Sequence, residues 1–168
     1  MVQKKIREDI QFLRGLSVLL IFFFHFDQQL FKYLYVGVDI FFLISGYVIT
    51  SSIFNSIKYN NKFDLFGYFL KRIKRIYPAL IFFLICFNFL FFSIIDYTDG
   101  EYIQKWFSTL TSLFGISNFY YLLNPGLGYF DSNIKWLQHT WSLSNEIQFY
   151  ILYGLLIFFL INLKNSIN

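Results

Sequence analysis

Long apolar runs alternate with short polar stretches along the whole chain. Five runs are long enough to cross a hydrocarbon layer about 30 Å thick as helices, and they cover residues 12–31, 36–54, 76–95, 106–123 and 140–162. The fourth run, which contains serine, threonine and glycine, is the least apolar of the five. Since backbone polar groups in lipid must be satisfied within the spanning structure, the pattern predicts an all-α, polytopic transmembrane helical bundle of about five helices with short loops.

The polar stretches between the runs predict where the helices begin and end. Residues 55–64 form a polar connection to an expected amphipathic helix over 65–77, and Pro78 follows where the first turn of a spanning helix accepts it. Pro125 belongs to a second group of helix breakers, after which a loop without periodicity continues to the last run. The sequence contains no internal repeat and no low-complexity tract, so we expect a single transmembrane domain over residues 1–168.

Composition agrees with a membrane protein. Hydrophobic residues make up 57% of the chain and aromatic residues 24%, and only 14% of residues are charged, compared with about 25% in soluble domains. The first run contains His25 and no small-residue cleavage site follows it, so we expect a retained helix rather than a secretory signal. Cys86 is the only cysteine and lies inside the third run, where it is expected to act as a small hydrophobic residue.

The positive charges are concentrated beside two of the expected spans. Ten of the fourteen Lys and Arg residues lie there: Lys4, Lys5, Arg7, Arg14, Lys58, Lys62, Lys71, Arg72, Lys74 and Arg75. The positive-inside rule therefore predicts a multi-pass protein whose N-terminus and 55–75 loop are cytoplasmic. A basic loop can also bind nucleic acid or anionic lipid, but topology is sufficient here, so we expect a lipid bilayer and no nucleic acid as a partner.

His25 is the first candidate for chemistry, since an ionisable side chain at bilayer depth is costly and often functional. Arg14 lies eleven residues earlier, which places both side chains on one helix face about 16 Å apart along the axis. Two interpretations are open. His25 joins helices as a hydrogen-bonded residue while Arg14 anchors the helix in headgroups, or desolvation keeps the imidazole neutral for general-base work. Spacing alone favours the structural interpretation.

Arg72 and Arg75 lie three residues apart in a basic segment, and therefore near each other on a helix. A guanidinium group donates in a rigid fork that suits phosphate, although topology and headgroup contact are sufficient to explain the pair. Asp39 lies inside the second run, where a carboxylate must pair, be protonated or face a cavity. Ser45 and Gly46, almost two turns further on, offer a face for close helix packing, so structural pairing of Asp39 is the favoured interpretation.

Glu146 lies one helical turn after Ser142 on the same face, and Tyr150 follows one turn later. Ser142 lacks the strained turn of a serine nucleophile, so we expect a supporting role for it. Glu146 is the better catalytic candidate, either orienting a base or accepting a hydrogen bond from a substrate. The sequence contains no His-Glu-x-x-His spacing and no phosphate-binding glycine-rich loop, so we expect no metal site.

Four sequence motifs follow one another along the chain. They are Arg14-Gly15-Leu16 followed by His25, residues 36–49 (VGVDIFFLISGYVI), residues 68–78 (YFLKRIKRIYP) and residues 140–150 (TWSLSNEIQFY). In content and order they resemble the membrane-bound acyltransferase 3 family, and four motifs together are far more specific than any one of them. The resemblance extends over nearly the whole chain and favours the functional interpretation of His25.

The resemblance implies an integral membrane O-acyltransferase of the bacterial inner membrane. Such proteins move an acyl group, commonly acetyl, from cytoplasmic acyl-CoA to a hydroxyl of a cell-surface glycan or lipid-linked saccharide, such as lipopolysaccharide. The family's motifs correspond to Arg14 with His25, to the pair Arg72 and Arg75, and to Glu146. The arginines are then expected to bind donor phosphates, and His25 and Glu146 to be catalytic, with His25 deprotonating the acceptor or carrying the acyl group transiently. Acyl-CoA is a substrate here, so no permanently bound cofactor is expected.

Full members of the family are longer, so the chain resembles only the N-terminal half of their bundle. A half bundle would leave polar groups facing lipid, and we therefore expect a second half or a homo-oligomer as partner. Two other functions stay open: a transporter or flippase-like subunit for a sugar lipid, and an inactive fragment that acts as an assembly partner. Paired arginines suit a phosphate ligand better than a transported sugar, which favours the enzyme.

Overall fold

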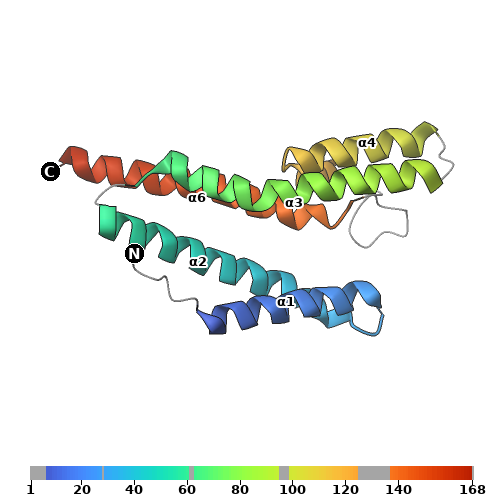
Figure 1. Cartoon of the computed structure of the whole chain (residues 1–168), viewed down its shortest axis with the longest axis horizontal. Coiled ribbons are helices and arrows are strands. Elements are labelled where there is room, and N and C mark those ends of the chain that lie inside the picture. Colours follow the sequence, from blue (N-terminus) through green and yellow to red (C-terminus); the bar gives the residue numbers. More distant parts are fainter. Residues whose placement is uncertain (1–6, 28, 61–62, 95–98, 125–136, 168) are drawn as a thin grey trace. The chain divides into compact units, whose positions relative to one another are not determined.

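The structure, a computed structural model, describes residues 7–27, 29–60, 63–94, 99–124 and 137–167. Its helices are α1 (Glu8–Phe26), the 3-10 helix η1 (Lys32–Tyr35), α2 (Val36–Asn60), α3 (Leu65–Ile94), α4 (Asp99–Leu113), α5 (Ser117–Leu123) and α6 (Thr140–Ile167) (Figure 1). No strand occurs in these described ranges. The predicted all-α architecture is therefore confirmed.

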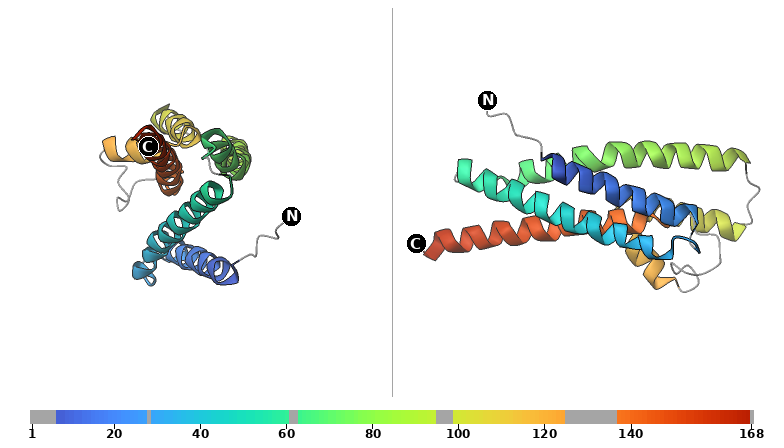
Figure 2. Two further views of the ribbon diagram at one scale, coloured as in Figure 1. Left: turned by 90° about the vertical axis from the view of Figure 1, so that its left-hand side faces the viewer. Right: turned by 90° about the horizontal axis from the view of Figure 1, so that it is seen from below.

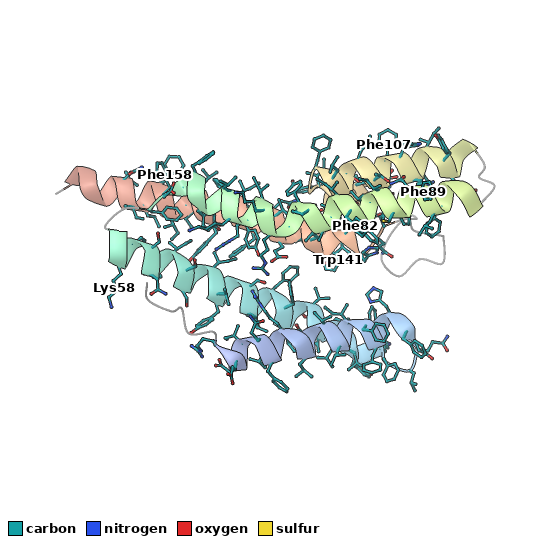
Figure 3. All side chains as sticks on the ribbon, viewed as in Figure 1. Lys58, Phe82, Phe89, Phe107, Trp141 and Phe158 are labelled. Atoms are coloured by element: carbon teal, nitrogen blue, oxygen red, sulfur yellow. The ribbon has the colours of Figure 1, made fainter. Side chains whose placement is uncertain are left out.

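Among the described residues, four helices are long and apolar enough to cross a membrane, namely α1, α2 together with η1, α3 and α6. Large apolar side chains are exposed along them, among them Phe82 and Phe89 on α3 (Figure 3). In water such surface would be unfavourable, whereas contact with lipid chains satisfies it. The described helices thus confirm a multi-pass membrane protein.

Residues 106–123, which we expected to form the fourth span, are divided between the end of α4 and α5. The break occurs at Gly115, whose φ of +67° is strained for any residue with a side chain. The Gly115 N–H donates to the Ser112 carbonyl at 3.2 Å, and the Ile116 N–H donates to the Thr111 carbonyl at 2.9 Å. These two bonds form a Schellman motif that ends α4, so this run contains two short helices instead of one span.

The third long helix, α3, continues without interruption through Pro78. The sequence predicted an amphipathic helix over 65–77 and a separate span after it, but one helix of 30 residues contains both. An interior proline removes one backbone hydrogen bond, a loss that neighbouring groups can offset inside a bundle. Asp64 caps the start of α3, since its Oδ1 atom accepts from the Gly67 N–H at 2.9 Å. The basic segment is therefore part of the same helix as the span.

The chain divides into two compact units, residues 1–63 and residues 64–168. In the first unit, α1 and α2 are antiparallel and lie side by side, connected through η1 (Figure 2). They approach closely at Gly37, where a Cβ atom would lie only 2.7 Å from the Ser17 carbonyl oxygen. At Gly46, where close packing is expected, a Cβ atom would have no atom of the described residues within 4 Å apart from its chain neighbours and the backbone of its own helix.

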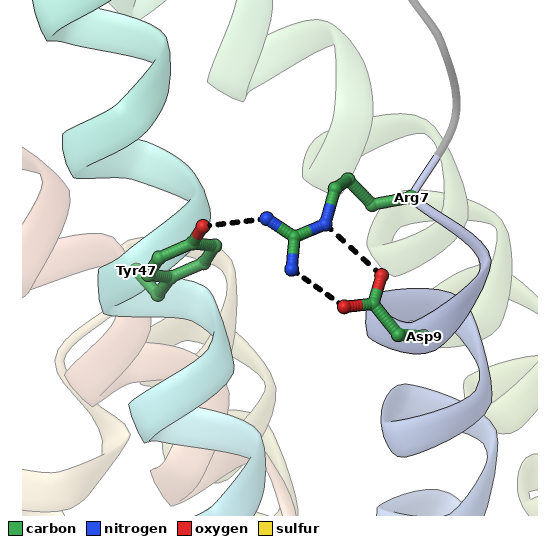
Figure 4. A network of polar contacts seen from close by, with 3 residues as sticks. All are labelled: Arg7, Asp9 and Tyr47. Atoms are coloured by element: carbon green, nitrogen blue, oxygen red, sulfur yellow. Dashed lines mark hydrogen bonds and ion pairs between the residues drawn. The ribbon is translucent and has the colours of Figure 1, made fainter.

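A polar network connects the start of α1 with α2 (Figure 4). Arg7 donates two hydrogen bonds to the Asp9 carboxylate, at 3.0 Å from Nε and 2.5 Å from Nη2, and a third from Nη1 to the Tyr47 hydroxyl at 2.8 Å. Hydrogen bonding and charge attraction by Asp9 raise the pKa of Arg7 further above its usual range. Arg7 is therefore positively charged, as the predicted basic N-terminal segment requires.

In the second unit, α6 packs against α3, α4 and α5. α3 and α6 lie side by side in two perpendicular views (Figures 1 and 2). Leu80 and Leu84 of α3 form an apolar cluster with Leu137, which lies just before α6. Hydroxyl groups buried between α4, α5 and the start of α6 belong to Ser112, Ser117, Thr140 and Ser144. Because α6 packs against α3, α4 and α5 at once, its orientation is set by all three helices, and this orientation determines which α6 side chains meet α3.

Candidate functional site

Four side chains from α3 and α6 meet within the second unit. Tyr68 and Arg72 lie one turn apart on α3, and Glu146 and Tyr150 lie one turn apart on α6. Because residues four apart share a helix face and the two helices pack together, one aromatic and one charged residue of each helix reach the interface. We call these four residues the α3–α6 cluster.

The Arg72 guanidinium lies against two aromatic rings. Its Cζ atom is 5.0 Å from the centroid of the Tyr68 ring and 5.8 Å from that of the Tyr150 ring. Both distances are within the range of cation–π attraction. The Nε atom of Arg72 is buried and has no hydrogen-bond partner among the described residues. Arg72 is thus held by ring contacts and retains a donor for an anionic ligand.

A hydrogen bond joins the two α6 members of the cluster. The Tyr150 hydroxyl donates to a carboxylate oxygen of Glu146, and both side chains are buried. The Tyr68 hydroxyl donates to the backbone carbonyl of Tyr150 at 3.2 Å. A buried carboxylate requires such donors, because leaving it without one is strongly unfavourable. Tyr150 therefore contacts Glu146 with its hydroxyl and Arg72 with its ring.

A pocket of about 440 Å³ lies between α3 and α6 beside the cluster. Its walls are mostly apolar and aromatic, with Arg72 as the charged residue, and they include Phe66, Phe69, Ile76 and Ile151. Ligand pockets commonly combine apolar walls with a few polar groups that set orientation. This pocket suits an amphiphilic ligand with an apolar chain and an anionic group.

His25 and Arg14 lie on α1 in the first unit, eleven residues apart on one helix. His25 is exposed in the described structure, and its Nδ1 atom lies 2.8 Å from the Ile21 carbonyl oxygen. Since a carbonyl only accepts, this hydrogen bond assigns the proton of the neutral ring to Nδ1 and leaves the lone pair on Nε2. A general base requires such a nitrogen.

The remaining predicted residues are distributed over both units. Arg75 is exposed on α3, Asp39 is exposed in the first turn of α2, and Ser45 is buried on α2. The Ser142 hydroxyl donates to the His139 carbonyl at 3.1 Å, a local bond at the start of α6. In the described ranges, no group of three or more His, Cys, Asp or Glu side chains could hold a metal ion.

Tyr68 and Tyr150 are the members of the cluster that sequence reasoning did not place in the site. Each lies four residues from a charged candidate, Tyr68 from Arg72 and Tyr150 from Glu146. That spacing is a signal in itself, because residues four apart are neighbours on a helix surface. It does not indicate that the Tyr150 ring reaches Arg72, since this contact depends on how α3 and α6 pack.

Comparisons with known proteins found a family and several relatives that this chain resembles. The chain matches the acyltransferase 3 family, described as an acyltransferase domain, over residues 7–168. It is 37% identical over 151 residues to the O-acetyltransferase OatA of Staphylococcus aureus (strain NCTC 8325 / PS 47), covering 89% of this chain and 24% of that protein. A putative O-acetyltransferase of Staphylococcus aureus (strain COL) is 30% identical, with 86% of this chain and 24% of that protein covered. A protein of Haemophilus influenzae is 38% identical over 71% of this chain and 47% of its own length.

The chain spans about a quarter of the length of the O-acetyltransferases that it matches. No solved structure matches it. The family match includes all the described helices and every residue of the α3–α6 cluster, as well as Arg14 and His25. The chain therefore belongs to the acyltransferase 3 family.

Proposed function

We propose that this chain forms part of a membrane O-acyltransferase. In this proposal, an acyl group, commonly acetyl, moves from acyl-CoA to a hydroxyl of a cell-surface glycan or a lipid-linked saccharide. The relatives named as O-acetyltransferases support the class of reaction. In the part of the chain that the structure describes, four helices are suited to spanning a membrane, which supports a reaction carried out within the bilayer.

The observation that carries the proposal is the position of Arg72 at the wall of the α3–α6 pocket. Its buried Nε atom has no hydrogen-bond partner among the described residues, and guanidinium donors bind phosphate oxygens well. CoA combines phosphates with a long, narrow arm and carries an apolar acyl group at its end, which corresponds to the charge and the apolar walls of this pocket. Arg75, exposed one turn further along α3, adds a second positive charge, and Arg14 is proposed as the third.

His25 is the proposed general base. Its Nε2 lone pair takes the proton of the acceptor hydroxyl, and the acceptor oxygen attacks the thioester carbonyl carbon. The carbon–sulfur bond then breaks, the acyl group stays on the acceptor oxygen, and CoA leaves as a thiolate that takes up a proton. Arg14 lies about 16 Å from His25 along the axis of α1, a length over which the donor arm extends between phosphate and thioester. Glu146 orients the base or the acceptor hydroxyl.

The proposed setting is the inner membrane, with the N-terminus and the basic start of α3 on the cytoplasmic side, where acyl-CoA is available. The proposed domain covers residues 1–168. Polar groups of the spanning helices must be shielded from lipid. The proposal therefore includes a partner, either a second half of the bundle or a further copy of the chain. The donor is a substrate that leaves after each turnover, and the proposal requires no permanently bound cofactor.

Release of CoA thiol by the detergent-solubilised protein tests this proposal, with acetyl-CoA and a cell-envelope glycan fraction as substrates. We expect His25→Ala to reduce release by about a hundredfold, because it removes the group that accepts the proton. We expect Arg72→Ala to weaken acetyl-CoA binding by about tenfold, because it removes charge-assisted hydrogen bonds to phosphate.

Lys74→Ala is the matched control, since Lys74 is an exposed basic residue on the same helix. It should leave donor binding within about twofold of the wild type, as expected for an exposed charge in water. Transfer by His25→Ala at the wild-type rate would exclude His25 as the base. Equal weakening by Lys74→Ala and Arg72→Ala would show that general positive charge, and not the Arg72 site, attracts the donor.

A further inference from the structure

We propose that Tyr150 and Tyr68 are positioning residues of the donor site. Their rings hold the Arg72 guanidinium at the wall of the α3–α6 pocket, and the Tyr150 hydroxyl holds the Glu146 carboxylate. This inference rests on the proposed function, because Arg72 acts on acyl-CoA only if the chain takes part in acyl transfer. It adds two aromatic residues to the proposed donor site, which otherwise consists of charged residues.

The first step concerns the surroundings of Arg72. The ring faces of Tyr68 and Tyr150 lie close to Arg72, with their centroids 5.0 Å and 5.8 Å from its Cζ atom. Arg72 is partly buried, and a carboxylate paired with it would occupy donors that a phosphate needs. Ring faces stabilise the cation without accepting conventional hydrogen bonds from it. The buried Nε donor, which has no hydrogen-bond partner among the described residues, therefore remains available to a ligand.

The second step concerns the position of the Tyr68 ring. A Cβ atom at Gly154 on α6 would lie 2.6 Å from Cε1 of Tyr68, so the ring occupies space that only glycine leaves open. The Tyr68 hydroxyl also donates to the Tyr150 carbonyl at 3.2 Å. One hydrogen bond and one close contact with α6 thus determine where this ring lies. The ring in turn restricts where Arg72, one turn along α3, can place its guanidinium.

The third step concerns the two contacts of Tyr150. Its ring face lies 5.8 Å from Arg72 Cζ, and its hydroxyl donates to the Glu146 carboxylate. The Tyr150 side chain therefore contacts both the proposed donor-binding residue, Arg72, and Glu146, which is proposed to orient the base or the acceptor hydroxyl. The two contacts use different atoms, so substitutions can separate them. Phenylalanine retains the ring and removes the hydroxyl, whereas leucine removes both.

The experiment compares acetyl-CoA binding and steady-state transfer in the purified protein. We expect Tyr150→Leu to raise the Kd for acetyl-CoA by about tenfold, because the cation loses a desolvated ring contact. We expect Tyr150→Phe to change this Kd by less than about threefold while kcat falls by about tenfold, because Glu146 loses one buried hydrogen bond. Tyr68→Leu should resemble Tyr150→Leu in its effect on donor binding.

A double-substitution cycle with Arg72→Ala decides whether the ring acts through Arg72. If it does, Tyr150→Leu weakens donor binding no further in a protein that already contains Arg72→Ala. Additive losses would overturn the inference, since they would show that Tyr150 contributes independently of Arg72. A Tyr150→Phe protein that loses donor binding as severely as Tyr150→Leu would also overturn it.

Phe159→Leu is the matched control, an aromatic substitution at an exposed position of α6 away from the pocket. It should bind acetyl-CoA as the wild type does, and thermal unfolding in detergent checks that every variant is folded. The two proposals fail differently. A wild-type protein that binds no acetyl-CoA overturns the proposed function and this inference with it. Donor binding that depends on Arg72 but is unchanged in Tyr150→Leu overturns the positioning role alone.

Discussion

Two glycine residues of α2 have opposite surroundings. A Cβ atom at Gly37 would lie 2.7 Å from the Ser17 carbonyl oxygen and 3.1 Å from a side-chain carbon of Ile21. At Gly46, no described atom outside the chain neighbours and the helix's own backbone lies within 4 Å of such an atom. Ser17 is fully buried, and its hydroxyl donates to the Arg14 carbonyl at 2.8 Å. A backbone oxygen in a helix cannot move without the helix, so α1 and α2 need the absence of a side chain at Gly37.

We therefore expect Gly37→Ala to destabilise the protein by about 1–3 kcal/mol, because the added methyl group overpacks the α1–α2 contact. Gly46→Ala should be neutral or stabilising by up to about 1 kcal/mol, because alanine is the better helix former and has room there. Thermal unfolding in detergent micelles measures both variants. If the two substitutions have the same effect, the close approach at Gly37 does not determine the packing of α1 and α2.

At the scale of secondary structure, buried hydroxyl groups connect the broken helix pair α4 and α5 with α6. The Ser144 Oγ atom on α6 accepts from the Ser117 N–H at 3.1 Å and lies 2.8 Å from Ser117 Oγ. The Thr140 Oγ1 atom lies 2.7 Å from Ser112 Oγ and 3.1 Å from Ser117 Oγ. These hydrogen bonds satisfy polar groups near the helix break at Gly115, which stabilises two short helices where the apolar run alone predicted one.

Ser144→Ala should lower the free energy of unfolding by about 1–3 kcal/mol, because it leaves the Ser117 N–H buried without its acceptor. Ser142→Ala, two residues earlier on α6, should have a smaller effect, since Ser142 is only partly buried and makes one local bond to His139. Denaturant or thermal unfolding of the two purified variants gives the comparison. A larger loss for Ser142→Ala would contradict a structural role of the hydroxyl cluster.

At the scale of the whole molecule, charge defines the expected orientation in the membrane. α3 begins near the basic segment and contains 30 residues, a length of about 45 Å, which exceeds the hydrocarbon thickness of about 30 Å. Its two ends therefore reach opposite sides of a bilayer when it spans. Because cytoplasmic loops have an excess of Lys and Arg, we expect the start of α3 in the cytoplasm and the start of α4 on the other side.

Cysteine labelling in cells tests this orientation. In a Cys86→Ser background, a membrane-impermeant maleimide should label Tyr102→Cys on α4 in intact spheroplasts. Lys58→Cys, at the exposed end of α2, should react only after the membrane is permeabilised. Labelling of Lys58→Cys from outside the cell would place the basic loop where cytoplasmic acyl-CoA cannot reach it, and the proposed donor site would be wrong.

The sequence indicated the candidate residues unevenly. Arg14, His25 and Glu146 were recognisable as candidates because placing an ionisable side chain within or beside an apolar run costs free energy, so such residues are often functional. The partner of Glu146 was also indicated, since Tyr150 lies one turn away on the same face. Tyr68 likewise lies one turn from Arg72 on the same helix. The contact of Arg72 with Tyr150 was not indicated, because that ring reaches it from another helix. Local spacing describes one helix at a time and contains no information about such contacts.

The sequence by itself determined the class of the protein, its long spans and the concentration of positive charge, because run length, polarity and charge are local properties that lipid and water select directly. Tertiary structure decided how those helices are used. The break at Gly115 occurs where α4 and α5 pack against α6. The close approach of α1 and α2 requires glycine at position 37 and not at position 46. The contact of α3 with α6 brings Arg72 to Tyr150. Each of these three features depends on packing against a neighbouring helix, so the sequence of the segment that contains the residue cannot predict it.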